Sequence, residues 1–255
     1  MLTLHRATRQ GPDRRPLIAA LGALSLTAWL ALWLWGQSAH ARFLHHDATA
    51  SASAGGADAT LFVVGWAVMI VAMMLPTSVP LIATFGALVA RRRNPALLVG
   101  LLVVAYVVVW TTFGVGVYLA DRVLHVVVDA TPWLAEHTAV IAAATLAVAG
   151  IYQFTPLKYQ CLDECRSPLG FVLAHWAGRH ERLEAFRMGI AHGLFCVGCC
   201  WSLMLVMFAV GLGSLAWMLV LGVVMAVEKN VAWGRRLSRP LGVVLILAAL
   251  LALNG

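Results

Sequence analysis

Long apolar runs, separated by short clusters of basic residues, constrain the fold of this chain more than any other feature. Apolar residues make up 62% of the 255 residues and charged residues only 11%. One water-soluble core cannot bury so much apolar surface, so lipid must cover much of it. The runs are long and do not alternate with period two, and a lipid environment leaves only helices or closed barrels. The sequence therefore predicts an all-α integral membrane protein.

About seven such segments predict a single polytopic membrane domain over residues 1–255. The second segment contains Pro76 and Pro80, which predict a kinked span because proline interrupts the helical hydrogen-bond ladder. Residues 121–137 are amphipathic and predict a short interfacial helix or loop, with Trp133 near the headgroups. The predicted spans cover approximately residues 17–35, 61–90, 96–120, 138–154, 188–210, 215–227 and 241–254.

The basic residues predict the orientation of these spans. With a cytoplasmic N-terminus and a periplasmic C-terminus, the cytoplasmic side holds 16 of the 18 Lys and Arg residues, and only Arg42 and Arg122 lie outside. This asymmetry is typical of a multi-pass protein of the bacterial inner membrane. Because the net charge of +7 is spread over such clusters, the lipid bilayer is the predicted partner and nucleic acid is not.

All five cysteines fall into two clusters, Cys161/Cys165 and Cys196/Cys199/Cys200, and none lies in a predicted outer loop. A disulfide framework belongs on the oxidising face, so these residues are predicted to be thiols, metal ligands or redox groups. The alternative is that they pack as small apolar side chains.

The predicted fifth span carries a stripe of metal-binding residue types. His192 and the three cysteines that follow it share roughly a third of the helix circumference, and Met207 continues the stripe. Thiolate, thioether and imidazole groups suit Cu(I) above all, and also Zn(II). Gly193 and Gly198 are small residues that allow a neighbouring helix to approach closely.

The other thiol cluster is predicted to lie on a cytoplasmic helix that begins at Thr155, a good N-cap. Cys161 and Cys165 are one turn apart on this helix, and Lys158 or Arg166 is placed to favour a thiolate. The C-x3-C spacing differs from the C-x2-C of thioredoxin-like centres and weakens a redox interpretation. This helix is predicted to fold against the fifth span and to join the thiols into one site.

Further candidate residues lie in other spans. Met73 and Met74 come just before Pro76, and beside soft ligands they indicate an ion path, although methionine is more often a core residue. Glu228 and Lys229 end the sixth span, where they are expected to pair with each other or to snorkel.

The loop after the first span contains a run of metal-binding residue types, His40, His45, His46 and Asp47. Such a run either collects a divalent ion in the periplasm or belongs to a solvated loop.

Four segments together carry a resemblance to a known family: AMMLPTSVP (72–80), YQFTPLKYQCLDECRSPLGF (152–171), GIAHGLFCVGCCWSLM (189–204) and WMLVLGVVMAVEKN (217–230). They resemble an uncharacterised prokaryotic family of predicted metal-binding integral membrane proteins, domain of unknown function 2182. The first and last spans lie outside this resemblance. The residues that it implicates are Met73, Met74, Pro76, Cys161, Cys165, His192, Cys196, Cys199, Cys200, Met204 and Glu228.

The predicted function is therefore the handling of a soft metal, Cu(I) before zinc, as a chaperone, a transporter or a factor in metalloprotein assembly. A second membrane or periplasmic metalloprotein is a candidate partner. No nucleotide-binding, Ser-His-Asp or zincin motif is present, so no catalytic residue is predicted and an enzyme is disfavoured. Two alternatives stay open: a membrane thiol–disulfide oxidoreductase, and a structural subunit whose Cys and Met residues only pack.

Overall fold

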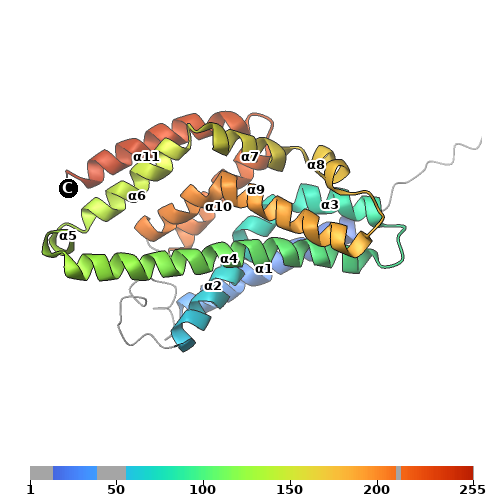
Figure 1. Ribbon diagram of the computed structural model, residues 1–255, viewed down its shortest axis with the longest axis horizontal. Coiled ribbons are helices and arrows are strands. Elements are labelled where there is room, and N and C mark those ends of the chain that lie inside the picture. Colours follow the sequence, from blue (N-terminus) through green and yellow to red (C-terminus); the bar gives the residue numbers. More distant parts are fainter. Residues whose placement is uncertain (1–13, 39–55, 211–213, 255) are drawn as a thin grey trace, which may run out of the picture.

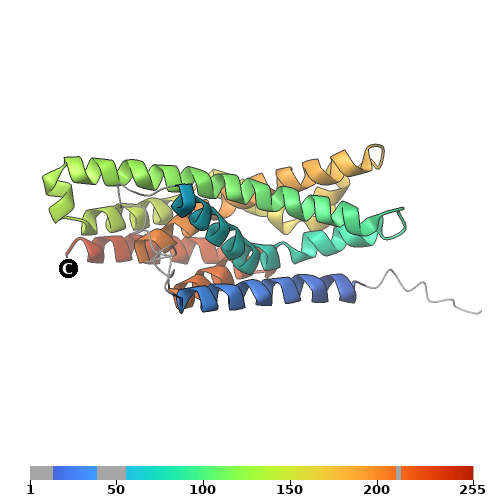
Figure 2. The ribbon, with the colours of Figure 1, turned by 90° about the horizontal axis from the view of Figure 1, so that it is seen from below.

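The computed structural model describes residues 14–38, 56–210 and 214–254, and in these ranges the chain is helical without a β-strand. Most helices run along the long axis of one bundle (Figure 1). Seen from below, α4 follows one side of the bundle and α1 the other (Figure 2). The elements are α1 (Arg15–Gly36), α2 (Gly56–Thr77), α3 (Val79–Val89), α4 (Pro95–Ala130), α5 (Pro132–Glu136), α6 (Ala139–Tyr152), α7 (Pro156–Arg166), α8 (Pro168–His175), α9 (Glu181–Val210), α10 (Leu215–Asn230), the 3₁₀ helix η3 (Gly234–Leu237) and α11 (Ser238–Ala252).

Several helices meet the requirements of a membrane span. Within the described residues, α1, α2, α4 and α9 are long and apolar enough to cross a bilayer, and the bent pair α6–α7 makes a fifth candidate. The remaining predicted spans correspond to α10 and α11, which have only 16 and 15 residues. The all-α architecture is compatible with a multi-pass membrane protein, and the count of seven spans stays a prediction.

The boundary predicted after residue 120 is wrong. α4 continues without interruption to Ala130, so that no separate interfacial helix begins at Asp121. The helix ends at Thr131, whose backbone is extended (φ −125°, ψ 92°) because the following Pro132 disfavours the helical conformation at the residue before it. Only α5 remains of the predicted interfacial segment.

The prolines of the second predicted span produce a break rather than a kink, with α2 ending at Thr77 and α3 beginning at Val79. Pro76 has no N–H, so the carbonyl of Ala72 loses its helical partner. Two side chains of α1 replace it: the hydroxyl of Ser25 donates to this carbonyl at 2.9 Å and the indole of Trp29 at 3.1 Å. The packing of α1 therefore compensates for the proline.

Removing both donors is expected to destabilise the bundle. A Ser25→Ala/Trp29→Phe variant leaves the buried Ala72 carbonyl unsatisfied, which should lower the free energy of unfolding by about 1–3 kcal/mol. Denaturant titration in mixed micelles measures this. Thr27→Val is the matched control, because the Thr27 hydroxyl is exposed and donates within its own helix to Leu24. Equal stabilities of the two variants would contradict the compensating role of α1.

Small residues on α9 set the distances between the central helices. A Cβ on Gly193 would come within 2.8 Å of Val109 on α4, and a Cβ on Gly198 within 2.5 Å of the Cys161 sulfur on α7. The predicted close approach at both glycines is thus confirmed. It places the α7 thiols directly on α9.

Candidate metal centre

The two thiol clusters, 34 residues apart in the sequence, meet between α7 and α9. The sulfur of Cys165 lies 3.9 Å from that of Cys199, which in turn lies 3.3 Å from that of Cys200. Cys196 is within interaction range of the same three thiols. All five cysteines are free. The sequence-based prediction that the α7 helix folds against the fifth span agrees with this geometry.

The turn between α6 and α7 brings the clusters together. Thr155 is extended (φ −74°, ψ 142°) before Pro156, and its hydroxyl accepts a hydrogen bond from the Lys158 N–H at 3.3 Å. This is the predicted N-cap, and it directs α7 at 65° to α6. The hydroxyl of Tyr152 at the end of α6 donates to the carbonyl of Gly198 and fixes the corner to α9.

A buried lysine stands beside the innermost thiol. The ammonium group of Lys229 on α10 donates to the Cys196 sulfur at 2.8 Å and to the Thr77 hydroxyl at 3.2 Å. The Tyr106 hydroxyl forms a second hydrogen bond with this sulfur, at 3.0 Å. Lys229 is 4% exposed and Cys196 is fully buried, so the site combines thiols with one cation in an apolar interior.

Lys158 and Glu228 form a separate buried ion pair. Nζ of Lys158 lies 2.9 and 3.0 Å from the carboxylate oxygens of Glu228, and it also donates to the Gln153 side chain. Ser238 donates to the same carboxylate at 2.6 Å, and Arg166 donates to the Glu228 backbone carbonyl.

This ion pair corrects two predictions. Lys158 and Arg166 point toward the end of α10 and not toward the thiols, so neither promotes a thiolate. Glu228 and Lys229 do not pair with each other, because successive residues of a helix point about 100° apart and here meet different neighbours. The Glu228 carboxylate, a predicted ligand, is occupied by a cation.

His192 lies next to the thiols, but within the described residues it forms no hydrogen bond with any of them. Its ring is stacked on Tyr106 with centroids 5.4 Å apart, and Nε2 is 3.0 Å from the Ser78 hydroxyl. In the described part of the chain, Nδ1 is buried and has no hydrogen-bond partner. A nitrogen lone pair or N–H in that position is available to a ligand.

Most methionines belong to the same core as the thiols. Seven of the nine share one buried cluster with Cys161, Cys196, Cys199 and Cys200, and Cys165 packs against it. The seven come from α2, α9 and α10, and include all four that were predicted as site residues: Met69, Met73, Met74, Met204, Met207, Met218 and Met225.

The thiols are gathered in close pairs. Among the described residues, no three His, Cys, Asp or Glu side chains already form a ligand set for one metal ion. Structural zinc almost always requires four ligands in a tetrahedron. Thiolate and thioether donors are the soft ligand types that select Cu(I), and thiolates also bind zinc. The donor types therefore suit a soft or borderline metal ion.

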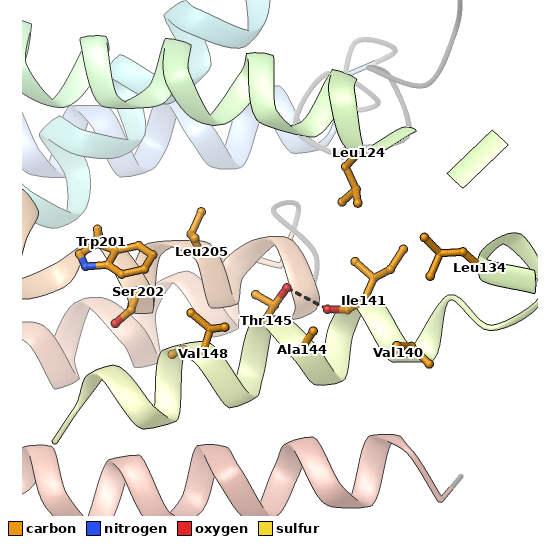
Figure 3. A pocket seen from close by; sticks show the side chains of 11 residues that line it. Leu124, Leu134, Val140, Ile141, Ala144, Thr145, Val148, Trp201, Ser202 and Leu205 are labelled. Carbon is orange, nitrogen blue, oxygen red and sulfur yellow. Dashed lines mark hydrogen bonds between the residues drawn. The ribbon is translucent and has the colours of Figure 1, made fainter. Parts of the chain in front are cut away.

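An apolar pocket of about 380 Å³ lies away from this centre, between α4, α6 and α9 (Figure 3). Its polar side chains are Thr145, which donates to the Ile141 carbonyl at 2.9 Å, and Ser202. No ionisable side chain is among those that line it. Such a pocket does not suit a charged cargo.

The structure also contains site residues that the sequence analysis did not assign. Tyr106 and Lys229 contact Cys196, while Thr77 and Ser78 contact Lys229 and His192. The sequence did contain a signal for Thr77 and Ser78. They lie between Pro76 and Pro80, where the helix is interrupted. The predicted histidine loop, with His40, His45 and His46, lies outside the described residues.

The fold and the site define a class, that of all-α proteins in which several apolar helices surround a core containing thiols and thioethers, an arrangement compatible with a multi-pass membrane protein. Residues 63–252 match the model of the PpoB2 family, described as copper chaperone, and with this share of its length matched the chain belongs to that family. The match contains all four resembling segments and extends through α11, which the resemblance had left out. Comparison with curated proteins and with solved structures gives no match.

Proposed function

We propose that this protein binds Cu(I) as a cargo at the thiols of Cys165, Cys196, Cys199 and Cys200 and passes it to a metalloprotein in or beside the bacterial inner membrane. The single observation that carries the proposal is the approach of Cys165 on α7 to Cys199 on α9, at 3.9 Å between sulfurs. Thiols from two distant segments meet in the interior of a chain from a copper chaperone family.

The surroundings of the thiols suit a transferable ion. Cys196, Cys199 and Cys200 are buried and Cys165 is partly exposed, so bound copper is largely shielded from water and can be reached from the side of α7. The methionines of α2, α9 and α10 continue the soft-donor surface away from the thiols. Thioethers are neutral and adaptable ligands, so Met73, Met74, Met204 and Met207 serve as the path along which the ion enters or leaves.

The proposed orientation follows from the basic residues. A cytoplasmic N-terminus puts the Arg91–Arg93 turn, the start of α9 and the end of α10 on the cytoplasmic side. The thiols then lie toward the reducing compartment, where they stay free. The opposite ends of α4 and α11 face the periplasm, where a copper-requiring partner receives the ion.

Copper retention tests this function. The wild-type protein, loaded with Cu(I) under reducing conditions and desalted, is expected to retain copper in preference to zinc. Cys165→Ser removes one of four sulfurs and should weaken copper binding by at least about tenfold, because loss of a group that only supports a ligand already costs about 10- to 100-fold. Elemental analysis and competition with a Cu(I) chelator measure both quantities.

Met188→Leu is the control, because Met188 is fully buried in the other core cluster, away from the thiols. It should retain copper like the wild type. Absence of copper from the wild type after loading would overturn the proposed function.

The same preparation separates a thiol oxidoreductase from a copper carrier. The sulfurs of Cys165 and Cys199 are 3.9 Å apart, so a disulfide, with its bond length of about 2.05 Å, requires these two side chains to move toward each other. Thiol counting after mild oxidation detects such a bond. A reversible disulfide in a protein that retains no copper would favour the redox function.

A further inference from the structure

A basic cleft lies where α7, α10 and α11 meet, apart from the thiols. Its volume is about 610 Å³, and its lining comprises Tyr159, Arg166, Ala232, Arg235, Arg236 and Arg239. Four guanidinium groups thus face one cleft. The repulsion between these positive charges is unfavourable unless anions neutralise them.

Carboxylates neutralise only part of the positive charge of these arginines. Arg235 forms a two-point ion pair with Asp163, at 2.9 and 3.1 Å, and its guanidinium lies over the Tyr159 ring, 4.9 Å from the centroid. Arg166 is held by the carbonyls of Glu228 and Ala232. Within the described residues, Arg166, Arg236 and Arg239 have no ion pair with a carboxylate. A planar guanidinium with free N–H groups is suited to bind a phosphate.

Tyr159 supplies a second, independent indication of a ligand. Its hydroxyl oxygen is buried in the wall of this cleft and, as far as the structure is described, has no hydrogen-bond partner. A buried polar group is normally satisfied, so an unpaired one points to a group that binds there. An oxygen of a phosphate, placed among the arginines, would accept this hydrogen bond.

The cleft lies where an apolar surface changes to a charged one. Next to the cleft, α11 begins at Ser238. Its following turns carry exposed apolar side chains such as Val243, Val244 and Leu247. Trp233, 56% exposed, stands beside the arginines, and tryptophan prefers the level of the lipid headgroups. Gly234 makes the turn possible, because a Cβ there would collide with the Val227 carbonyl.

We propose that this cleft is a binding site for a phosphate group, held by Arg166, Arg236 and Arg239 and by the Tyr159 hydroxyl, and that the group belongs to the headgroup of an anionic phospholipid. Basic pockets between helices on the cytoplasmic side of a membrane bind such headgroups. The site contains none of the thiols, although Arg166 directly follows Cys165 on α7. It fixes the corner of α7 and α10 at the bilayer surface.

Native mass spectrometry of the full-length protein in detergent tests the proposal, with phosphatidylglycerol, phosphatidylcholine and inorganic phosphate as probes. Phosphatidylglycerol should bind at a single site and the zwitterionic lipid at least tenfold more weakly. Each basic residue near a membrane surface contributes about a fivefold factor, so Arg236→Gln/Arg239→Gln should weaken binding about 25-fold. Tyr159→Phe should weaken it several-fold without changing the charge.

Arg91→Gln/Arg93→Gln is the matched control, with two equally exposed arginines on the turn between α3 and α4, and it should bind like the wild type. Weak inorganic phosphate binding beside tight phosphatidylglycerol binding supports the lipid headgroup. Equally tight inorganic phosphate binding supports the phosphate site and overturns the lipid assignment. Equal lipid binding by the wild type and the cleft variants, or displacement by an acidic peptide but not by phosphate, overturns the site.

Discussion

Replacing Glu228 with glutamine is expected to lower the free energy of unfolding by about 3–5 kcal/mol, because the change leaves a buried ammonium group without its counter-ion. The Lys158 and Glu228 side chains are 0% and 1% exposed, and no solvent is available to stabilise either charge alone. Gln153 and Ser238 hydrogen-bond to the pair but carry no charge. Denaturant titration in mixed micelles measures the loss.

The double variant Lys158→Met/Glu228→Leu separates the effect of the lone charge from that of the pair. Removing both charges from an apolar interior is often close to neutral, so most of the lost stability should return. The double variant also tests Glu228 as a metal ligand, since the carboxylate is already engaged by Lys158 and should not be needed. A double variant that folds like the wild type but binds no copper would restore Glu228 to the metal site.

The elements of this fold were predictable where local chemistry decides them. Apolar length predicted the helices and Thr155 predicted the start of α7, whereas the prolines at 76 and 80 predicted only a kink where the structure has a break. The continuation of α4 beyond residue 120 was not predicted. The amphipathic character of residues 121–137 suggested a separate segment, whereas the helix is stopped only before the proline at 132.

The partners of the charged residues were not predictable in the same way. Helical spacing placed the cysteines on common faces, and the structure brings those faces together. The choice between Lys158 and Lys229 as the cation beside the thiols depends on how α10 packs against α7 and α9. Spacing along one helix contains no information on the neighbour that a side chain meets across 70 residues of sequence.

Replacing Lys229 with methionine is expected to weaken Cu(I) binding on the order of 100-fold while the protein stays folded. Cu(I) bound by two or more thiolates forms a complex with net negative charge, and the Lys229 ammonium, 2.8 Å from the Cys196 sulfur, offsets one unit of that charge. A unit charge at about 4 Å contributes about 4 kcal/mol at an effective dielectric constant of 20, and the desolvation of the ammonium offsets part of this.

The controls for Lys229 distinguish charge from packing. Thr77→Val removes the other hydrogen-bond partner of the ammonium but leaves every charge in place, so copper affinity should fall by clearly less than in Lys229→Met. Methionine nearly matches lysine in length and adds a soft donor, so a loss of affinity in Lys229→Met cannot result from a cavity or from a missing ligand. Competition with a Cu(I) chelator at constant pH, with thermal unfolding measured on the same samples, compares the variants. If Lys229→Met binds copper as tightly as the wild type, the thiols hold the ion without a compensating cation, and the buried lysine serves the packing of α10 alone.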